Sequence, residues 1–187
     1  MEGMSRAQVD SAEAKDFALG GKPMRPRDAA TLILLDRSGG ETRVLMGRRS
    51  MKHAFMPGRL VFPGGRTDPS DSRVTTADAL HPSVEAKLVA GTGSRMSSAR
   101  ARAIALSAVR ETYEEAGLLI GRKGDYRTRR EGWLGFAENG VEPTLSNLRM
   151  IARAITPPGR VRRFDTRFIA GYAPGVAVEL AEGGPTE

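Results

Sequence analysis

The chain of 187 residues contains no cysteine, and its only histidines are His53 and His81. The lack of cysteine excludes disulfides, thiolate zinc sites and a cysteine nucleophile, and it is typical of proteins from a reducing cytosol. Two histidines leave almost nothing for a two-histidine metal site or a Ser-His-Asp triad. The longest apolar run, residues 29–35, is far shorter than the ~18 residues that span a bilayer. We therefore expect a soluble, cytoplasmic protein with no membrane association.

Acidic residues are in the minority, because 29 Lys and Arg stand against 22 Asp and Glu, for a net charge of +7. A positive field raises the local concentration of anions, so nucleic acids and small phosphorylated metabolites are both candidate partners. A net charge of this size is also within the ordinary range for solubility. Charge alone does not choose between these interpretations.

The length suits one domain. Residues 1–27 are polar and weakly patterned, and we expect a mobile leader with a short helix over 5–18, followed by a single domain over 28–187. Hydrophobic patterns and turn residues predict strands over 29–36, 42–48, 59–62, 118–121 and 160–172. They predict helices over 82–90, from Ser97 or Ser98 to Ala116, and over 143–155, with loops over most of 66–96 and 122–142. Strands mixed with such helices indicate an α/β fold.

The predicted helix that ends at Ala116 carries the most informative pattern. Glu111, Glu114 and Glu115 fall within an arc of ~100° on the helical wheel, opposite an apolar face. Clustered like charges cost stability, and a hard divalent cation would offset that cost. The alternative is a solvated acidic face that Arg110 partly neutralises.

Two neighbouring features favour the cation. Gly117 follows the carboxylates directly and suits the left-handed position that ends a helix. Upstream, Phe62-Pro63-Gly64-Gly65 can bring bare backbone carbonyls close to a ligand, because glycine has no Cβ to obstruct the approach.

Together these segments resemble the Nudix box, G-x5-E-x7-R-E-U-x-E-E-x-G-U with U apolar. Residues 110–118 match its second half except for Thr112 at an apolar position. In the first half Asp71 replaces glutamate, and the spacer of 38 residues over 72–109 exceeds the family's 7 by 31. We place this insertion at about 72–96. A branch of the family that includes coenzyme A diphosphatases carries a long insertion here.

The resemblance covers residues 28–175 and implies a Nudix-type α/β/α sandwich with a mixed sheet. It implies a Mg²⁺- or Mn²⁺-dependent hydrolase that cleaves the diphosphate linkage of a nucleoside diphosphate joined to another moiety. Its partner would thus be a small-molecule nucleotide derivative.

The resemblance also implies roles for individual residues. Glu114 and Glu115 would hold the metal with the Gly64 carbonyl, Glu111 would be a further ligand or the base, and Arg110 would orient the carboxylates. Many family members use another glutamate outside the box, for which the candidates are Glu131, Glu138 and Glu142.

Substrate contacts are less clearly marked. Arg48 and Arg49 precede the glycine turn and are candidates to contact substrate phosphates. The alternative for these two arginines is a solvated strand end. The backbone at Gly65 is a further candidate for substrate contact. Part of a coenzyme A diphosphatase motif fits around Arg49, but Ala54 replaces its second arginine. Coenzyme A or a derivative is therefore one candidate substrate.

Three further features carry open alternatives. Trp133 is a candidate to stack on a base, although packing in the core is favoured. Alternating arginines at 160, 162, 163 and 167 could form a wall for an anionic ligand, with an exposed strand face favoured instead. Nudix domains continue into a further strand and helix, whereas residues 182–187 resemble a loop. A truncated chain, a short gene or a partner subunit that completes the layer would each explain this, and the last predicts a homodimer.

Two other functions compete with a small-molecule hydrolase. A non-catalytic nucleic-acid-binding or regulatory protein on a Nudix scaffold would use the arginines to contact phosphates, but it would not need the complete set of glutamates. An enzyme that processes RNA 5′ ends would share the chemistry and differ only in the size of its substrate.

Overall fold

The structure is a computed structural model that describes residues 24–48, 58–90, 97–160 and 162–178. The predicted leader helix over 5–18, Arg49 and the tail over 182–187 lie outside these residues. Within them, no helix is both long enough and apolar enough to span a bilayer.

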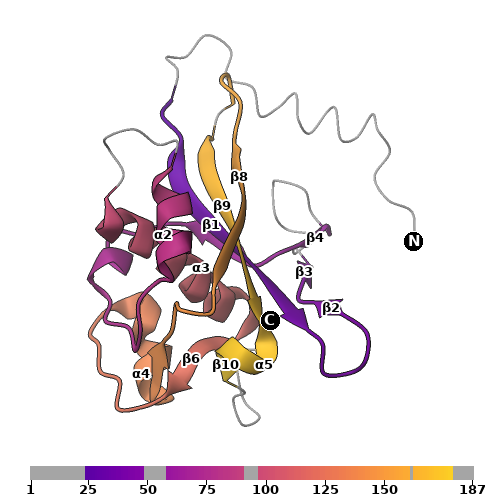
Figure 1. Cartoon of the computed structure of the whole chain (residues 1–187). Helices are drawn as coiled ribbons and strands as arrows, with labels where there is room; N and C mark the ends of the chain where they lie inside the picture. Colours follow the sequence, from indigo (N-terminus) through magenta and orange to yellow (C-terminus); the bar gives the residue numbers. More distant parts are fainter. Residues whose placement is uncertain (1–23, 49–57, 91–96, 161, 179–187) are drawn as a thin grey trace.

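A five-stranded mixed sheet forms the centre of the fold (Figure 1). Strand β1 (Arg27–Asp36) runs parallel to β9 (Phe164–Tyr172), and every other pairing in this sheet is antiparallel. The strands that complete it are β2 (Arg43–Val44), β5 (Gly64–Arg66) and β8 (Arg149–Ile155). The predicted α/β class with a mixed sheet is confirmed.

The core lies between this sheet and two helices, α2 (Pro82–Val89) and α3 (Ser98–Ala116) (Figure 1). Alternate residues of β1, namely Ala30, Leu32 and Leu34, are buried against α3. Period-two alternation of this kind places one face of a strand in the core.

The bounds of α3 follow from its local sequence. The Ser97 side chain accepts a hydrogen bond from the backbone N–H of Arg100 at 3.2 Å, which caps the first turn. Gly117 ends the helix with φ of 68°, a conformation that glycine adopts without steric cost. The predicted start and end of this helix are both confirmed.

Shorter elements surround the sheet. Strands β3 (Gly47–Arg48) and β4 (Leu60–Val61) pair with each other, and β6 (Leu119–Lys123), β7 (Val141–Pro143) and β10 (Ala177–Val178) form a small antiparallel sheet. The remaining helices are η1 (Asp71–Arg73), η3 (Glu131–Trp133), α4 (Leu134–Glu138) and α5 (Ala173–Val176).

Several predicted elements were wrong. Residues 149–155 form β8 and not a helix, because pairing with β9 overrides the helical propensity of their Arg, Met and Ala residues. The predicted strand over 42–48 is divided between β2 and β3, and the predicted loop over 122–142 contains η3 and α4. Residues 64–66 form β5, a strand that the sequence did not predict.

Arg167 corrects the expectation of an exposed row of arginines. Its register opposite Ala30 turns the side chain to the face that packs on α3, where it is fully buried. It forms ion pairs with Asp28 at 3.0 Å and Asp165 at 3.2 Å. Arg167 thus joins β1 to β9 from inside the fold and is not part of an exposed anion-binding wall.

Candidate active site

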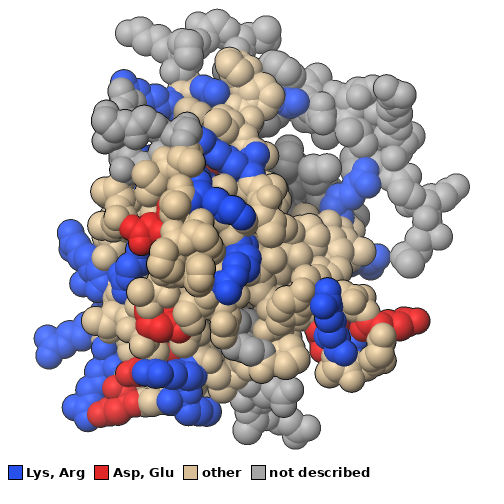
Figure 2. Space-filling view, viewed as in Figure 1, with Lys and Arg blue, Asp and Glu red and all other residues tan. Residues whose placement is uncertain are grey.

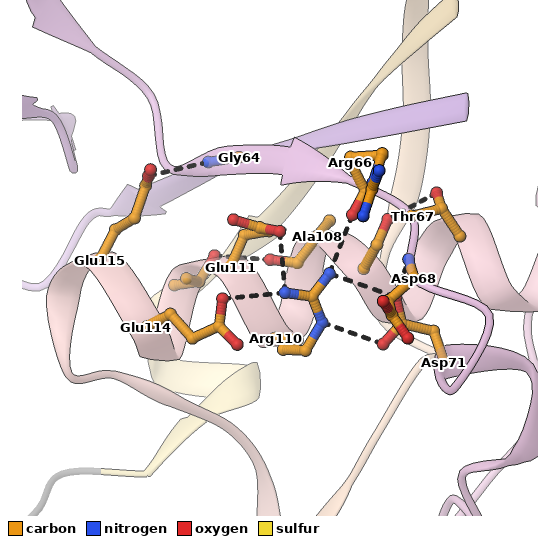
Figure 3. A network of polar contacts seen from close by, with 12 residues as sticks. Gly64, Arg66, Thr67, Asp68, Asp71, Ala108, Arg110, Glu111, Glu114 and Glu115 are labelled. Atoms are coloured by element: carbon orange, nitrogen blue, oxygen red, sulfur yellow. Dashed lines mark hydrogen bonds and ion pairs between the residues drawn. The ribbon is translucent and has the colours of Figure 1, made fainter. Parts of the chain in front are cut away.

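The guanidinium of Arg110, on α3, is the centre of a polar network (Figure 3). Its Nη1 lies 2.8 Å from Glu111 Oε1 and 2.8 Å from Glu114 Oε2. Its Nη2 donates a hydrogen bond to the backbone carbonyl of Arg66 at 2.9 Å. One cation therefore joins two glutamates of α3 to strand β5.

Asp71 holds this guanidinium from the other side. Its side chain is fully buried, and Oδ1 accepts hydrogen bonds from Arg110 Nε at 3.0 Å and from Trp133 Nε1 at 3.1 Å. Oδ2 accepts the backbone N–H of Asp68 at 2.9 Å. Asp71 thus ties the segment after β5 and the η3 helix to α3.

Glu115 reaches the backbone of β5 directly. The carbonyl of Pro63 points toward β1, because it accepts a hydrogen bond from the N–H of Leu32 at 2.9 Å. Along a strand of an antiparallel pair, the backbone groups of successive residues point alternately toward the partner strand and away from it. The N–H and C=O of Gly64 therefore point away from β1. The N–H donates to Glu115 Oε2 at 3.0 Å, so the Gly64 carbonyl lies on the edge of β5 that faces this glutamate.

The absence of a side chain at Gly65 is needed for the geometry of Glu111. A Cβ placed on Gly65 would lie 2.4 Å from the Cδ of Glu111, a distance at which the carboxylate would have to move. Glycine at this position therefore lets a carboxylate of α3 lie against the backbone of β5.

Electrostatics distinguish the groups of this network. Burial raises the pKa of Glu111; the charge of Arg110 opposes this effect, and the charges of Glu114 and Glu115 add to it. The pKa of Arg110 is above its usual value overall. Burial lowers this pKa, but the hydrogen bond and the charge of Asp71 raise it, and so do the charges of Glu111 and Glu114. The guanidinium is thus a permanent cation, while burial disfavours the charged form of Glu111 in spite of its ion pair with Arg110.

A cavity of about 810 Å³ opens beside the network. Its charged lining falls into two groups. The acidic lining residues are Asp68, Glu111, Glu114 and Glu131, and the basic ones are Arg66, Arg110, Arg129 and Arg130. A cavity with this lining can take a ligand that combines metal ions with phosphates.

The fold separates the three candidate glutamates outside the box. Glu131, at the start of η3, lines the cavity with Glu114. Glu142 lies on β7 and pairs with Arg122 at 3.4 Å, and Glu138 is exposed at the end of α4; neither is a lining residue. Glu131 is therefore the candidate that the fold brings to the network.

The candidate substrate residues are distributed differently. Gly65 lies against Glu111, within the network. Arg48 is exposed on β3 and is not a lining residue of the cavity, and Arg49 lies outside the described residues. Substrate contact by these three residues stays a prediction.

Sequence reasoning overlooked Arg66, Arg129 and Arg130, although the basic run over 127–130 was a visible signal. It also left the role of Asp71 in doubt. For Trp133, the favoured packing in the core is confirmed, because the ring is fully buried 4.9 Å from the ring of Phe136. A ring in that position has no face open to a base.

The donor set fits Mg²⁺ or Mn²⁺ by its chemistry. Carboxylate and carbonyl oxygens are the ligands such cations take, and Glu111 and Glu115 extend from α3 toward β5 (Figure 3). A cation there would also oppose the effects of burial and of the neighbouring carboxylates, which raise the pKa of Glu111. In the described residues, however, no three acidic or histidine side chains converge closely enough to hold a metal ion, and Arg110 contacts two of these carboxylates instead.

Solved structures of Nudix proteins align with this chain. A Nudix hydrolase from Alicyclobacillus acidocaldarius aligns at 29% identity over 80% of this chain and 70% of its own, with a TM-score of 0.58. A MutT/nudix family protein from Enterococcus faecalis aligns at 14% identity, over 90% of this chain and 44% of its own, with a TM-score of 0.43. The M. smegmatis Nudix hydrolase RenU aligns at 17% identity over 91% and 74%, with a TM-score of 0.41. No protein-family model and no curated protein matches the chain.

The mixed sheet, with an acidic helix beside a glycine strand, supports membership of the Nudix superfamily. The Alicyclobacillus protein, which aligns with this chain at 29% identity, is a Nudix hydrolase.

Proposed function

We propose that the protein is a Mg²⁺- or Mn²⁺-dependent hydrolase that cleaves the diphosphate linkage of a nucleoside diphosphate joined to another moiety. The observation that carries this proposal is the lining of the large cavity, which combines two glutamates of α3 with four arginines. Hydrolysis of a P–O–P bond needs cations around the phosphates and an oriented water molecule. Both requirements can be met by this set of residues.

Each side chain of the network has a separate task in this proposal. Glu114, Glu115 and the Gly64 carbonyl hold the metal, with Glu111 as a further ligand or as the base. The metal, when bound, neutralises charge on the diphosphate and makes water a better nucleophile. Arg110, held by Asp71, keeps Glu111 and Glu114 in place and does not touch the substrate.

The basic wall binds the substrate. It consists of Arg66, Arg129 and Arg130, which line the same cavity as Glu111 and Glu114 and donate to phosphate oxygens. Glu131 lies in the same lining and is our candidate for the additional glutamate that accepts a proton from the attacking water. Coenzyme A or a derivative is one candidate substrate, and the retained glutamates argue against a purely nucleic-acid-binding role.

A substrate panel tests the proposal. Coenzyme A and acyl derivatives, ADP-ribose, dinucleotides, nucleoside triphosphates and capped RNA are each incubated with Mg²⁺ or Mn²⁺. We expect the double variant Glu114→Gln/Glu115→Gln to lose at least ~100-fold in kcat with only a small fall in melting temperature, because glutamine keeps the shape of the side chains and Asp71 still pairs with Arg110. The matched control is Glu138→Gln on α4. Unchanged rates in the double variant would refute the proposal.

The role of Glu131 has its own test. A general base contributes about 10²–10⁴-fold to a rate, so Glu131→Gln should lower kcat by at least ~100-fold. Glu142→Gln, which alters a glutamate paired with Arg122 away from the cavity, should not change kcat. Equal rates for the two variants would remove Glu131 from the mechanism.

Two further proposals come from the sequence alone. We propose a cytoplasmic location, since the chain has no cysteine, and a homodimer. Light scattering of the purified protein tests the second, and a mass equal to one chain would exclude it.

A further inference from the structure

A second, smaller cavity of about 300 Å³ borders the first. It is lined by Arg73, the last residue of η1, by Thr75 and by the continuous segment 126–130. Arg129 and Arg130 line both cavities, so the two are neighbours that share one wall. A ligand in the first cavity can therefore extend into the second.

The charge of this second cavity is strongly positive. Four of its seven lining residues are arginines, and none is acidic. Arg127 pairs with Asp125 at 3.1 Å, but both side chains are highly exposed, so water screens the pair. Arg73, Arg129 and Arg130 form no ion pair with any residue the structure describes. An anion would compensate this charge. Lys and Arg side chains gather with a few acidic ones at the lower left of Figure 2, beside α4 and β6.

Tyr126 supplies an independent observation. Its side chain lines the same cavity and is 5% exposed, and its hydroxyl has no hydrogen-bond partner among the described residues. The hydroxyls of Thr75 and Thr128 lie close enough to oppose the rise in the pKa of Tyr126, but neither meets the geometry of a hydrogen bond. A buried hydroxyl without a partner costs folding free energy unless a ligand or water accepts its proton. Burial raises the pKa of Tyr126, so the hydroxyl keeps that proton at neutral pH.

We propose that this second cavity, bounded by Arg73, Tyr126 and Arg127, binds a phosphate monoester. Guanidinium groups suit phosphate because they donate two parallel hydrogen bonds, and the tyrosine hydroxyl adds a second kind of donor. The proposal rests on the diphosphate hydrolase activity proposed above and narrows its substrate class. The substrate is then a diphosphate in which the moiety beyond the scissile linkage carries its own phosphate group.

Phosphate binding is tested first without any reaction. Inorganic phosphate is titrated into the ¹⁵N-labelled full chain at low salt, and amide shifts are followed. We expect saturable shifts at residues 73–75 and 126–130, lost in the double variant Arg73→Ala/Arg127→Ala and weakened several-fold in Tyr126→Phe. Arg122→Ala, on β6 and lining neither cavity, is the control and should leave them unchanged.

Substrate class is tested with two matched pairs, coenzyme A against dephospho-coenzyme A and NADPH against NADH. The members of each pair differ by one phosphate. We expect the phosphorylated member of at least one pair to have a kcat/KM about tenfold higher, because its KM is lower. One charge-assisted contact with the additional phosphate would give a difference of this size. This ratio should fall to about one in Arg73→Ala/Arg127→Ala and stay unchanged in Arg122→Ala. Arg73→Lys/Arg127→Lys keeps the charge and should give an intermediate ratio.

The outcomes separate the two proposals. Saturable phosphate binding without hydrolysis of any diphosphate would retain the phosphate site and overturn the proposed function. Hydrolysis with ratios near one and no saturable binding would retain the function and overturn the phosphate site. Saturable binding with ratios near one in both pairs would identify a free anion as the occupant, and would overturn the inference that the substrate carries this phosphate.

Discussion

Asp71 is the residue whose replacement should disturb the site most, because it holds Arg110 and Trp133 at once. In Asp71→Ala the guanidinium of Arg110, whose side chain is 8% exposed, loses its fully buried counter-charge. The Trp133 indole N–H and the Asp68 backbone N–H lose their acceptor as well. Removing one partner of a buried ion pair costs about 3–5 kcal/mol, against a total stability of about 5–15 kcal/mol for a typical domain.

Urea unfolding followed by fluorescence measures this cost, since Trp133 is the only tryptophan and lies beside Asp71. Asp71→Asn keeps the shape and removes the charge, so it should lose most of the same stability. Asp71→Glu adds a methylene to a fully buried site and should cost about 1–3 kcal/mol by overpacking. The control, Asp125→Asn, alters an exposed pair and should leave the midpoint unchanged. A loss below about 1 kcal/mol in Asp71→Ala would refute the assignment of Asp71 as the anchor of Arg110.

Three further predictions follow from the same geometry. Gly65→Ala should lower kcat about tenfold or more with a small loss of stability, because its Cβ would meet the Glu111 carboxylate at 2.4 Å; rates like those of the wild type would contradict this. Gly64→Ala should instead lower the unfolding midpoint, since its Cβ would lie 2.6 Å from the Ala30 carbonyl oxygen in the sheet; an unchanged midpoint would show that β1 and β5 can separate. Burial raises the pKa of Asp165, but the hydrogen bond from Arg153 and the charges of Arg167, Arg153 and Arg100 lower it overall below 3.8. Its contribution to stability is therefore complete above about pH 5 and is lost as the pH falls through the folded pKa, so Asp165→Asn should flatten the acid limb of a plot of urea midpoint against pH.

The parts of the fold that depend on local sequence could be predicted from it. Helix α3 begins at a serine cap and ends at a glycine, and both signals lie within a few residues of the ends they set. Strand β8 could not be predicted in the same way. Its residues have helical propensity, and they form a strand because β9, which follows later in the chain, pairs with them.

In the candidate site, too, the features that depend on local sequence could be predicted, and the contacts between distant segments could not. The spacing of Glu111, Glu114 and Glu115 on one helix was visible in the sequence because it depends only on helical geometry. The contact of Asp71 with Arg110 was not, since the two are separated by the insertion and meet only when η1 packs on α3. The choice of Glu131 over two other glutamates likewise required the position of η3.

Arg167 shows a limit of strand alternation. Alternation predicts which residues share a face of a strand, but it does not say which face is covered. The parallel register that sets Arg167 opposite Ala30 decides this, and it turns an arginine expected at the surface into a buried ion pair.

The central claim is that the carboxylates of α3 hold a divalent cation against β5. Crystals of the protein grown with Mn²⁺ and measured at a wavelength where manganese scatters anomalously test it most directly. We predict a strong anomalous peak bounded by Glu111, Glu114, Glu115 and the Gly64 carbonyl, and its loss in Glu114→Gln/Glu115→Gln. Crystals at a Mn²⁺ concentration that supports turnover, with no peak between α3 and β5, would contradict the account.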